Sequence, residues 1–113
     1  MPNAANNYAT SLLDLQRHAE AKPLLRKIVP VTRRALGESH ELTFKMRCLC
    51  AVALFADPAA TLDDLREGVT ALEDTARTAR RVLGISHPLL QMMEGKLLIA
   101  QAMLRARETS SSA

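Results

Sequence analysis

Residues 33–40 read Arg-Arg-Ala-Leu-Gly-Glu-Ser-His, and residues 80–87 read Arg-Arg-Val-Leu-Gly-Ile-Ser-His, 47 positions further along a chain of 113 residues. In both copies an arginine pair precedes a glycine, which is the usual signal for the end of a helix. A serine and a histidine follow, where the next helix is expected to begin. A short chain that repeats a helix end, a turn and a helix start is built from stacked copies of one unit. We therefore predict an all-α solenoid.

The composition agrees with a helical chain and excludes several other classes. Four glycines, five prolines and 3% aromatic residues are too few turn-forming and β-forming residues for a β-sandwich. The net charge of +3 is mildly basic, and the scarcity of aromatic side chains to stack on bases disfavours nucleic-acid binding. We find no signal peptide and no apolar run of membrane-spanning length. Cys48 and Cys50 point to different faces of one helix, so we expect reduced thiols in a cytoplasmic protein.

Apolar periodicity and end signals divide the chain into five helices, over residues 3–15, 19–36, 40–56, 62–83 and 87–107. We expect residues 108–113 to form a disordered polar tail. Pro30 falls inside the second helix, where we predict a bend and not a break, because the apolar period continues through it. Ser39 is the expected cap of the third helix. Short connections force consecutive helices to run antiparallel, which gives two helical hairpins and a fifth, unpaired helix.

The first unit resembles a tetratricopeptide repeat. The resemblance rests on three stretches: Asn-Asn-Tyr-Ala-Thr-Ser-Leu-Leu at residues 6–13, Ala-Glu-Ala-Lys-Pro-Leu at 19–24 and Leu-Gly-Glu-Ser-His at 36–40. The pattern is most similar to the longer kinesin-light-chain-like variant. This resemblance implies a right-handed superhelix of about two and a half repeats over residues 1–107. It also implies a non-enzymatic scaffold that binds a protein or peptide on its concave face.

The chain departs from that family at specific positions. In kinesin-light-chain-like repeats an asparagine pair bonds the backbone of a bound peptide. This chain has the pair once, as Asn6-Asn7, and the matching positions of the later units hold Cys48-Leu49 and Gly95-Lys96 instead. Gln16 stands where the family usually has a glycine between helices.

The family's groove positions, carried over residue by residue, fall on the first, third and fifth helices. They are Asn3, Asn6, Asn7, Thr10, Leu13, Asp14, Lys45, Cys48, Val52, Phe55, Met92, Lys96 and Ile99. For Val52 and Phe55, packing between neighbouring units is an equally good interpretation.

The fifth helix suggests an alternative function, which is self-association. Apolar residues spread around most of its circumference, wider than a single buried stripe requires. A surface of that kind usually marks an interface. We predict that it packs against a second copy of the chain, in a two-fold homodimer, or against a further repeat. The residues predicted for this contact are Leu90, Met93 and Leu97.

The repeated arginine pairs suggest a third function. Arg33, Arg34, Arg80 and Arg81 are expected to form a basic edge that contacts an acidic peptide or nucleic acid. The simpler interpretation is that these cations suit the helix dipole and remain solvated.

No motif points to catalysis, a cofactor or a metal. Residues 39–41, Ser-His-Glu, have the residue types of a catalytic triad, but adjacent residues cannot form its hydrogen-bonded line. His40 and His87 occupy equivalent positions in different units, too far apart to share an ion, and the usual zinc spacings are absent. We predict no enzymatic activity, no cofactor and no metal.

Overall fold

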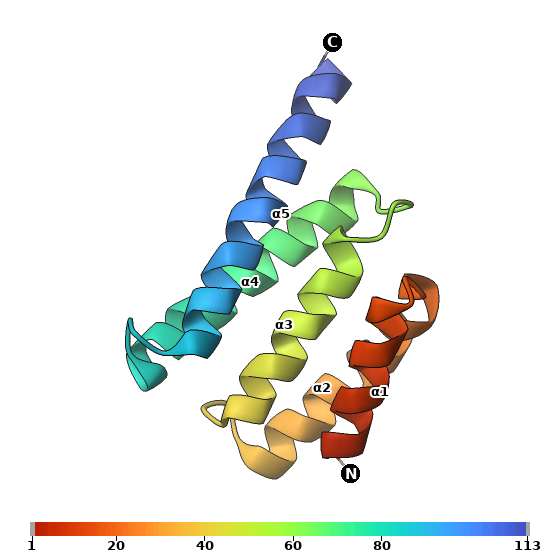
Figure 1. Ribbon diagram of the computed structural model, residues 1–113. Helices are drawn as coiled ribbons and strands as arrows, with labels where there is room; N and C mark the ends of the chain where they lie inside the picture. Colours follow the sequence, from red (N-terminus) through yellow and green to blue (C-terminus); the bar gives the residue numbers. More distant parts are fainter. Residues whose placement is uncertain (1, 113) are drawn as a thin grey trace.

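The computed structural model describes the backbone of residues 2–112 and the side chains of residue 4 and residues 6–110. The chain forms α1 (Pro2–Asp14), α2 (His18–Leu36), α3 (Glu41–Phe55), α4 (Leu62–Leu83) and α5 (Pro88–Ser112). No strand occurs over the described backbone, so the predicted all-α fold of five helices is confirmed (Figure 1). None of these helices, over the described range, is both long and apolar enough to cross a bilayer.

The helices form two layers. In Figure 1, α1, α3 and α5 lie side by side, with α2 and α4 behind them. The central helix α3 packs against all four others, whereas α1 and α5 do not approach each other anywhere in the described backbone. The layer of α1, α3 and α5 corresponds to the face that the tetratricopeptide resemblance predicts to be concave.

The helix bounds agree with the predicted ones to within one residue, except at the end of α5. Residues 108–112, predicted to be a disordered tail, continue the helix to Ser112, and Ala113 lies outside the described residues. Two contacts tie this end to the start of α4. The Arg107 guanidinium donates a hydrogen bond to the Ala60 carbonyl oxygen at 2.9 Å, and Glu108 lies 3.6 Å from Arg66. These contacts hold the helix at residues 107 and 108 against the region where α4 begins.

Both copies of the repeated stretch form the same turn. Gly37 and Gly84 have φ values of 91° and 89°, in a region that a side chain strongly disfavours. The N–H of Gly37 donates to the Arg33 carbonyl at 2.9 Å, and that of Gly84 to the Arg80 carbonyl at 3.1 Å. The glycine of the repeat is therefore required by the backbone conformation at each helix end.

A histidine begins the next helix at both junctions. The Nδ1 atom of His40 accepts the N–H of Leu42 at 3.0 Å, and Nδ1 of His87 accepts the N–H of Leu89 at 3.1 Å. The prediction that Ser39 caps α3 is wrong, because the imidazole one residue later has the reach to satisfy the free N–H.

The first helical hairpin contains two residues that are unusual for their backbone. Helix α2 continues through Pro30 without a break, as predicted. Gln16, in the turn before α2, has a φ of 58° and is the only residue other than glycine with positive φ in the described backbone. Its N–H donates to the Leu13 carbonyl at 2.9 Å, so this turn adopts a conformation that suits the family's glycine.

The core consists of two clusters on opposite sides of α3. One joins α3 to α1 and α2 and contains Ala9, Leu12, Ala21, Leu25, Met46 and Ala53. The other joins α3 to α4 and α5, with Phe44, Leu72, Leu90 and Met93 among its buried members. Cys48 belongs to the second cluster and Cys50 packs against the first, and both thiols are free.

The residues predicted for self-association lie inside the molecule. Leu90 and Met93 are fully buried in the cluster with α4, and Leu97 is partly buried against it. Leu90 and Met93 therefore cannot form the predicted dimer contact, whereas a contact at Leu97 stays a prediction. Part of the wide apolar surface of α5 covers α3 and α4, and the rest, at Met92, Leu98, Ile99 and Met103, is exposed. A helical pattern alone does not distinguish the two parts.

Candidate functional site

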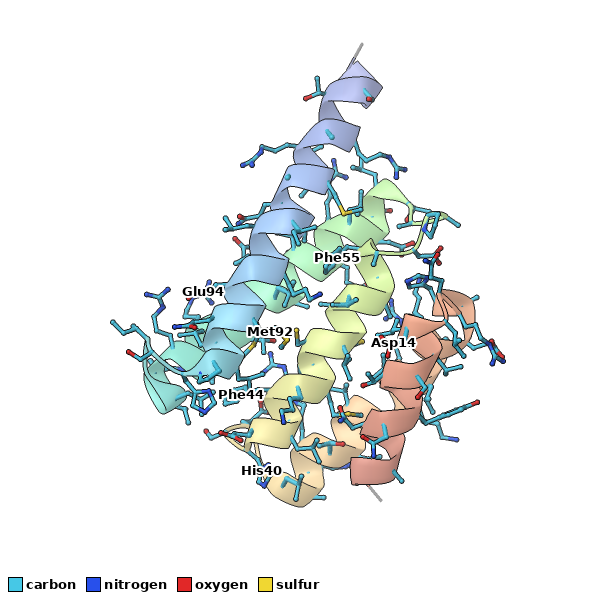
Figure 2. The ribbon with its side chains drawn as sticks, in the orientation of Figure 1. Asp14, His40, Phe44, Phe55, Met92 and Glu94 are labelled. Atoms are coloured by element: carbon cyan, nitrogen blue, oxygen red, sulfur yellow. The ribbon has the colours of Figure 1, made fainter. Side chains whose placement is uncertain are left out.

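A groove with a volume of about 570 Å³ lies on the layer of α1, α3 and α5. Figure 2 shows Met92 on α5 and Asp14 on α1, on either side of α3. Most of the predicted groove residues line this one cavity. They are Asn6, Thr10, Leu13, Asp14, Lys45, Cys48, Val52, Met92 and Lys96.

The sequence prediction missed part of the lining. These residues are Glu41, Leu49, His87, Pro88 and Leu89. Glu41 and Pro88 lie one helical turn before Lys45 and Met92, so extending the predicted groove face by four residues would have found them.

Other predicted residues do not line the cavity. Asn7 is exposed on the neighbouring face of α1, and Ile99 is exposed on α5 beyond Lys96. The side chain of Asn3 lies outside the described residues.

Phe55 is a core residue, and its assignment to the groove is wrong. Its side chain is 3% exposed and packs in the cluster that α3 forms with α4 and α5. Helix α4 comes unusually close at this point, because Gly68 has no side chain. A Cβ atom built on Gly68 would lie 3.3 Å from the Ala51 carbonyl oxygen and 3.5 Å from Cβ of Phe55. Phe55 therefore lies where α4 approaches α3 closely.

Charged side chains without an ion-pair partner among the described residues line the groove, and they are Lys45, Lys96 and Asp14. Lys45 and Lys96 form no ion pair within the part of the chain that the structure describes. Burial raises the pKa of the Cys48 thiol to about 11, and the positive charge of Lys96 acts in the opposite direction. Lys96 therefore lies within electrostatic reach of the groove floor at Cys48.

A histidine–carboxylate pair joins α3 to α5 at one end of the groove. Nε2 of His87 lies 2.8 Å from a carboxylate oxygen of Glu41. Since Nδ1 of His87 accepts the Leu89 N–H, the neutral ring carries its proton on Nε2 and donates to Glu41. These two side chains are thereby held at the rim, and their polar atoms are engaged with each other.

Asn6 is the groove residue with an unsatisfied polar atom. Its Oδ1 is buried and accepts no hydrogen bond, while its backbone carbonyl accepts from the Thr10 hydroxyl at 2.8 Å. A buried acceptor without a partner costs about 1–3 kcal/mol. No intramolecular bond to this oxygen opposes reorientation of the amide toward a ligand.

The predicted basic edge is partly neutralised. Arg33 pairs with Glu38 at 2.6 Å, and Arg80 pairs with Glu94. The arginine that follows each of them in the chain forms no ion pair among the described residues. The described residues also contain no cluster of three or more His, Cys, Asp or Glu side chains that could hold a metal ion.

Residues 3–41 match the family model described as "Tetratricopeptide repeat". The matched segment contains the helical hairpin of α1 and α2 and the turn into α3, which is one unit of the stack. This similarity supports the resemblance seen in the sequence over that unit. No curated protein and no solved structure matches the chain.

Proposed function

We propose that this chain is a non-enzymatic interaction module that holds a segment of a partner protein in the groove of α1, α3 and α5. The tetratricopeptide match supports protein binding in general. The observation that carries the proposal is that groove residues from three helices line a single cavity of about 570 Å³.

We also propose that the whole chain, and not the matched unit alone, is of the kinesin-light-chain-like variant and works in the cytoplasm. The identical turns at Gly37 and Gly84 and the identical histidine caps that follow them support a common origin of the units. The free thiols of Cys48 and Cys50 suit a reducing compartment.

The lining defines the chemistry of the partner segment. Leu13, Val52 and Met92 offer apolar contacts, and the ammonium groups of Lys45 and Lys96 lie among them without a carboxylate partner. Hydrogen bonds between ionised groups are roughly twice as strong as neutral ones. We therefore propose a segment that combines apolar side chains with aspartate or glutamate.

The test is a selection of random 16-residue peptides, displayed on phage, against the immobilised wild-type protein. The affinity of each selected peptide is then measured by fluorescence anisotropy for the wild type, Lys45→Glu and Lys96→Glu. Lys27→Glu is the matched control, because Lys27 is exposed on α2 and forms no ion pair.

We expect each groove variant to weaken binding about tenfold, which corresponds to about 1.4 kcal/mol, while the control binds like the wild type. The proposal fails if no peptide is selected, or if the selected peptides bind the groove variants and the wild type equally.

Self-association is a second candidate function, through a different face of α5 from the one first predicted. Residues with a spacing of 4, 3, 4 and 3 form an exposed stripe, which consists of Gln91, Gly95, Leu98, Ala102 and Arg105. A Cβ atom on Gly95 would have no neighbour within 4 Å, so packing inside the chain does not require this glycine.

Sedimentation analysis over a dilution series tests this second candidate. We expect a dimer that Leu98→Glu abolishes. A wild-type protein that remains monomeric at millimolar concentration would contradict it.

A further inference from the structure

We infer that the segment bound in the groove is an amphipathic α-helix lying along α5, and not an extended peptide that crosses the helices. This inference rests on the proposed function of the groove. It concerns the conformation of the partner, which follows from the spacing of the helices, the direction of the apolar strip on α5 and the polar groups of the groove lining.

The spacing of the helices leaves room for a helix beside α5. Both α1 and α5 pack against α3 and, over the described backbone, have no contact with each other. Packed helices lie about 8–10 Å apart. A partner helix that lies along α5 and over α3 therefore reaches both of these neighbours at an ordinary packing distance.

An exposed apolar strip leads out of the groove along the axis of α5. Met92, Ile99 and Met103 are 41%, 53% and 37% exposed, and their spacings of 7 and 4 place them on one face of α5. This strip begins in the cavity at Met92 and extends about 16 Å along the axis to Met103, which lies outside the cavity. Side chains at positions i, i+4 and i+7 of a partner helix match a strip of this direction. An extended peptide crossing from α1 to α5 meets it at a single point.

The polar groups of the lining also favour a partner with a satisfied backbone. An extended segment presents an N–H and a carbonyl at every residue, and each needs a hydrogen bond when buried. The groove walls are helices whose own backbone groups are engaged. Among the described lining side chains, Asn6 alone offers an amide, because Cys48-Leu49 and Gly95-Lys96 replace the other asparagine pairs. A helix satisfies its own backbone and needs only side-chain contacts.

The experiment uses the peptides whose binding Lys45→Glu weakens, together with two variants of α5. Met103→Glu adds a charge on the apolar strip but outside the cavity. Leu98→Glu is the matched control, since Leu98 is 67% exposed on another face of the same helix. Circular dichroism measures the helicity of each peptide, free and bound. A version of each peptide with a central proline is measured alongside.

We expect the groove-dependent peptides to carry apolar residues at a period of three to four and to gain helicity on binding. We expect at least about a tenfold loss of affinity with the central proline, since proline breaks a helix, and a loss of about tenfold for Met103→Glu. Leu98→Glu should bind like the wild type.

Groove-dependent peptides that tolerate the central proline, remain non-helical and bind Met103→Glu normally would overturn the inference and leave the proposed function intact. Peptides that do not respond to Lys45→Glu would instead contradict the proposed function itself.

Discussion

Helices α3 and α5 begin with the same junction and occupy equivalent positions in successive units, yet they differ in how they are covered. One face of α3 is buried by α4 and α5 and consists of Phe44, Cys48, Ala51 and Phe55. The equivalent face of α5, 47 positions later, consists of Gln91, Gly95, Leu98 and Ala102, and all four are exposed. A repeated junction thus determines where a helix begins and which way it runs. Burial depends on whether another helix follows to cover it.

The largest expected effect is on the free energy of unfolding when one side chain on each of the two faces is truncated. Phe55→Ala should lower the free energy of unfolding by about 3–4 kcal/mol, because it leaves a cavity where α4 approaches α3. Leu98→Ala should lower it by less than about 0.5 kcal/mol, because its side chain is exposed on α5. Urea unfolding of both variants measures the difference. Equal losses would mean that the face of α5 is covered in solution.

The second effect is on thiol reactivity. Burial raises the pKa of Cys48 to about 11, so its thiolate is scarce at neutral pH. A cysteine at the equivalent position on α5, introduced as Gly95→Cys, is exposed. We expect the new thiol to react with iodoacetamide at least about 100-fold faster than Cys48, since the thiolate is the nucleophile. Mass spectrometry of digested protein gives both rates. A protected thiol at position 95 would show that the stripe on α5 is an interface.

These contrasts show what the sequence could and could not predict. Glycine and proline act locally, so the two junctions and the helix bounds other than the end of α5 followed from the pattern. The cap of α3 did not, because two neighbouring residues, Ser39 and His40, can both accept a backbone N–H. The role of Phe55 did not, because it lies between the groove face and the α4 face of α3, and helical periodicity suits both. Gly68 lets α4 approach α3 closely beside Phe55, which favours the core role, and this approach is visible only in three dimensions.

Helical periodicity was equally ambiguous for α5. Leu90 and Met93 have the apolar character of an interface, and only the contacts with α4 show that they are core. For the groove, the family resemblance supplied positions on three helices, and most of these residues line one cavity. The polar rim formed by Glu41 and His87 lies outside those positions and was missed.

A third, smaller effect compares two glycines inside helices. Gly95→Ala on α5 should stabilise the protein by about 1 kcal/mol, because alanine is the better helix former and the site is open. Gly68→Ala should destabilise it by about 1 kcal/mol, because the strain of overpacking against Ala51 and Phe55 exceeds the same gain. Thermal unfolding shows the sign directly. A stabilising Gly68→Ala would mean that α3 and α4 can separate easily.

The smallest expected effect concerns how the helices begin. Imidazoles cap α3 and α5, whereas a capping box of Thr61 and Asp64 begins α4. The backbone N–H of Thr61 and the Lys22 ammonium hold the pKa of Asp64 below its usual value. Because the pKa of Asp64 is lower in the folded state than in the unfolded state, its ionised carboxylate adds to the free energy of unfolding. This added stability is fully present above about pH 5 and is lost as the pH falls through the folded pKa.

Asp64→Asn should therefore cost about 0.5–1 kcal/mol at pH 7 and progressively less below about pH 4. Urea unfolding of both proteins between pH 7 and pH 2 checks this. A cost that stays constant over the whole range would contradict the role of the Asp64 charge.

Backbone chemical shifts show whether a ligand occupies the groove of α1, α3 and α5. The protein labelled with ¹⁵N is titrated with a peptide selected against the wild type, and the shifted amides are mapped on the fold. We expect the shifts to gather around Asn6, Lys45, Met92 and Lys96 on three helices, and to extend along α5 to Met103. Shifts confined to the arginines at the ends of α2 and α4, or to the stripe around Leu98, would show that the groove is not the binding site.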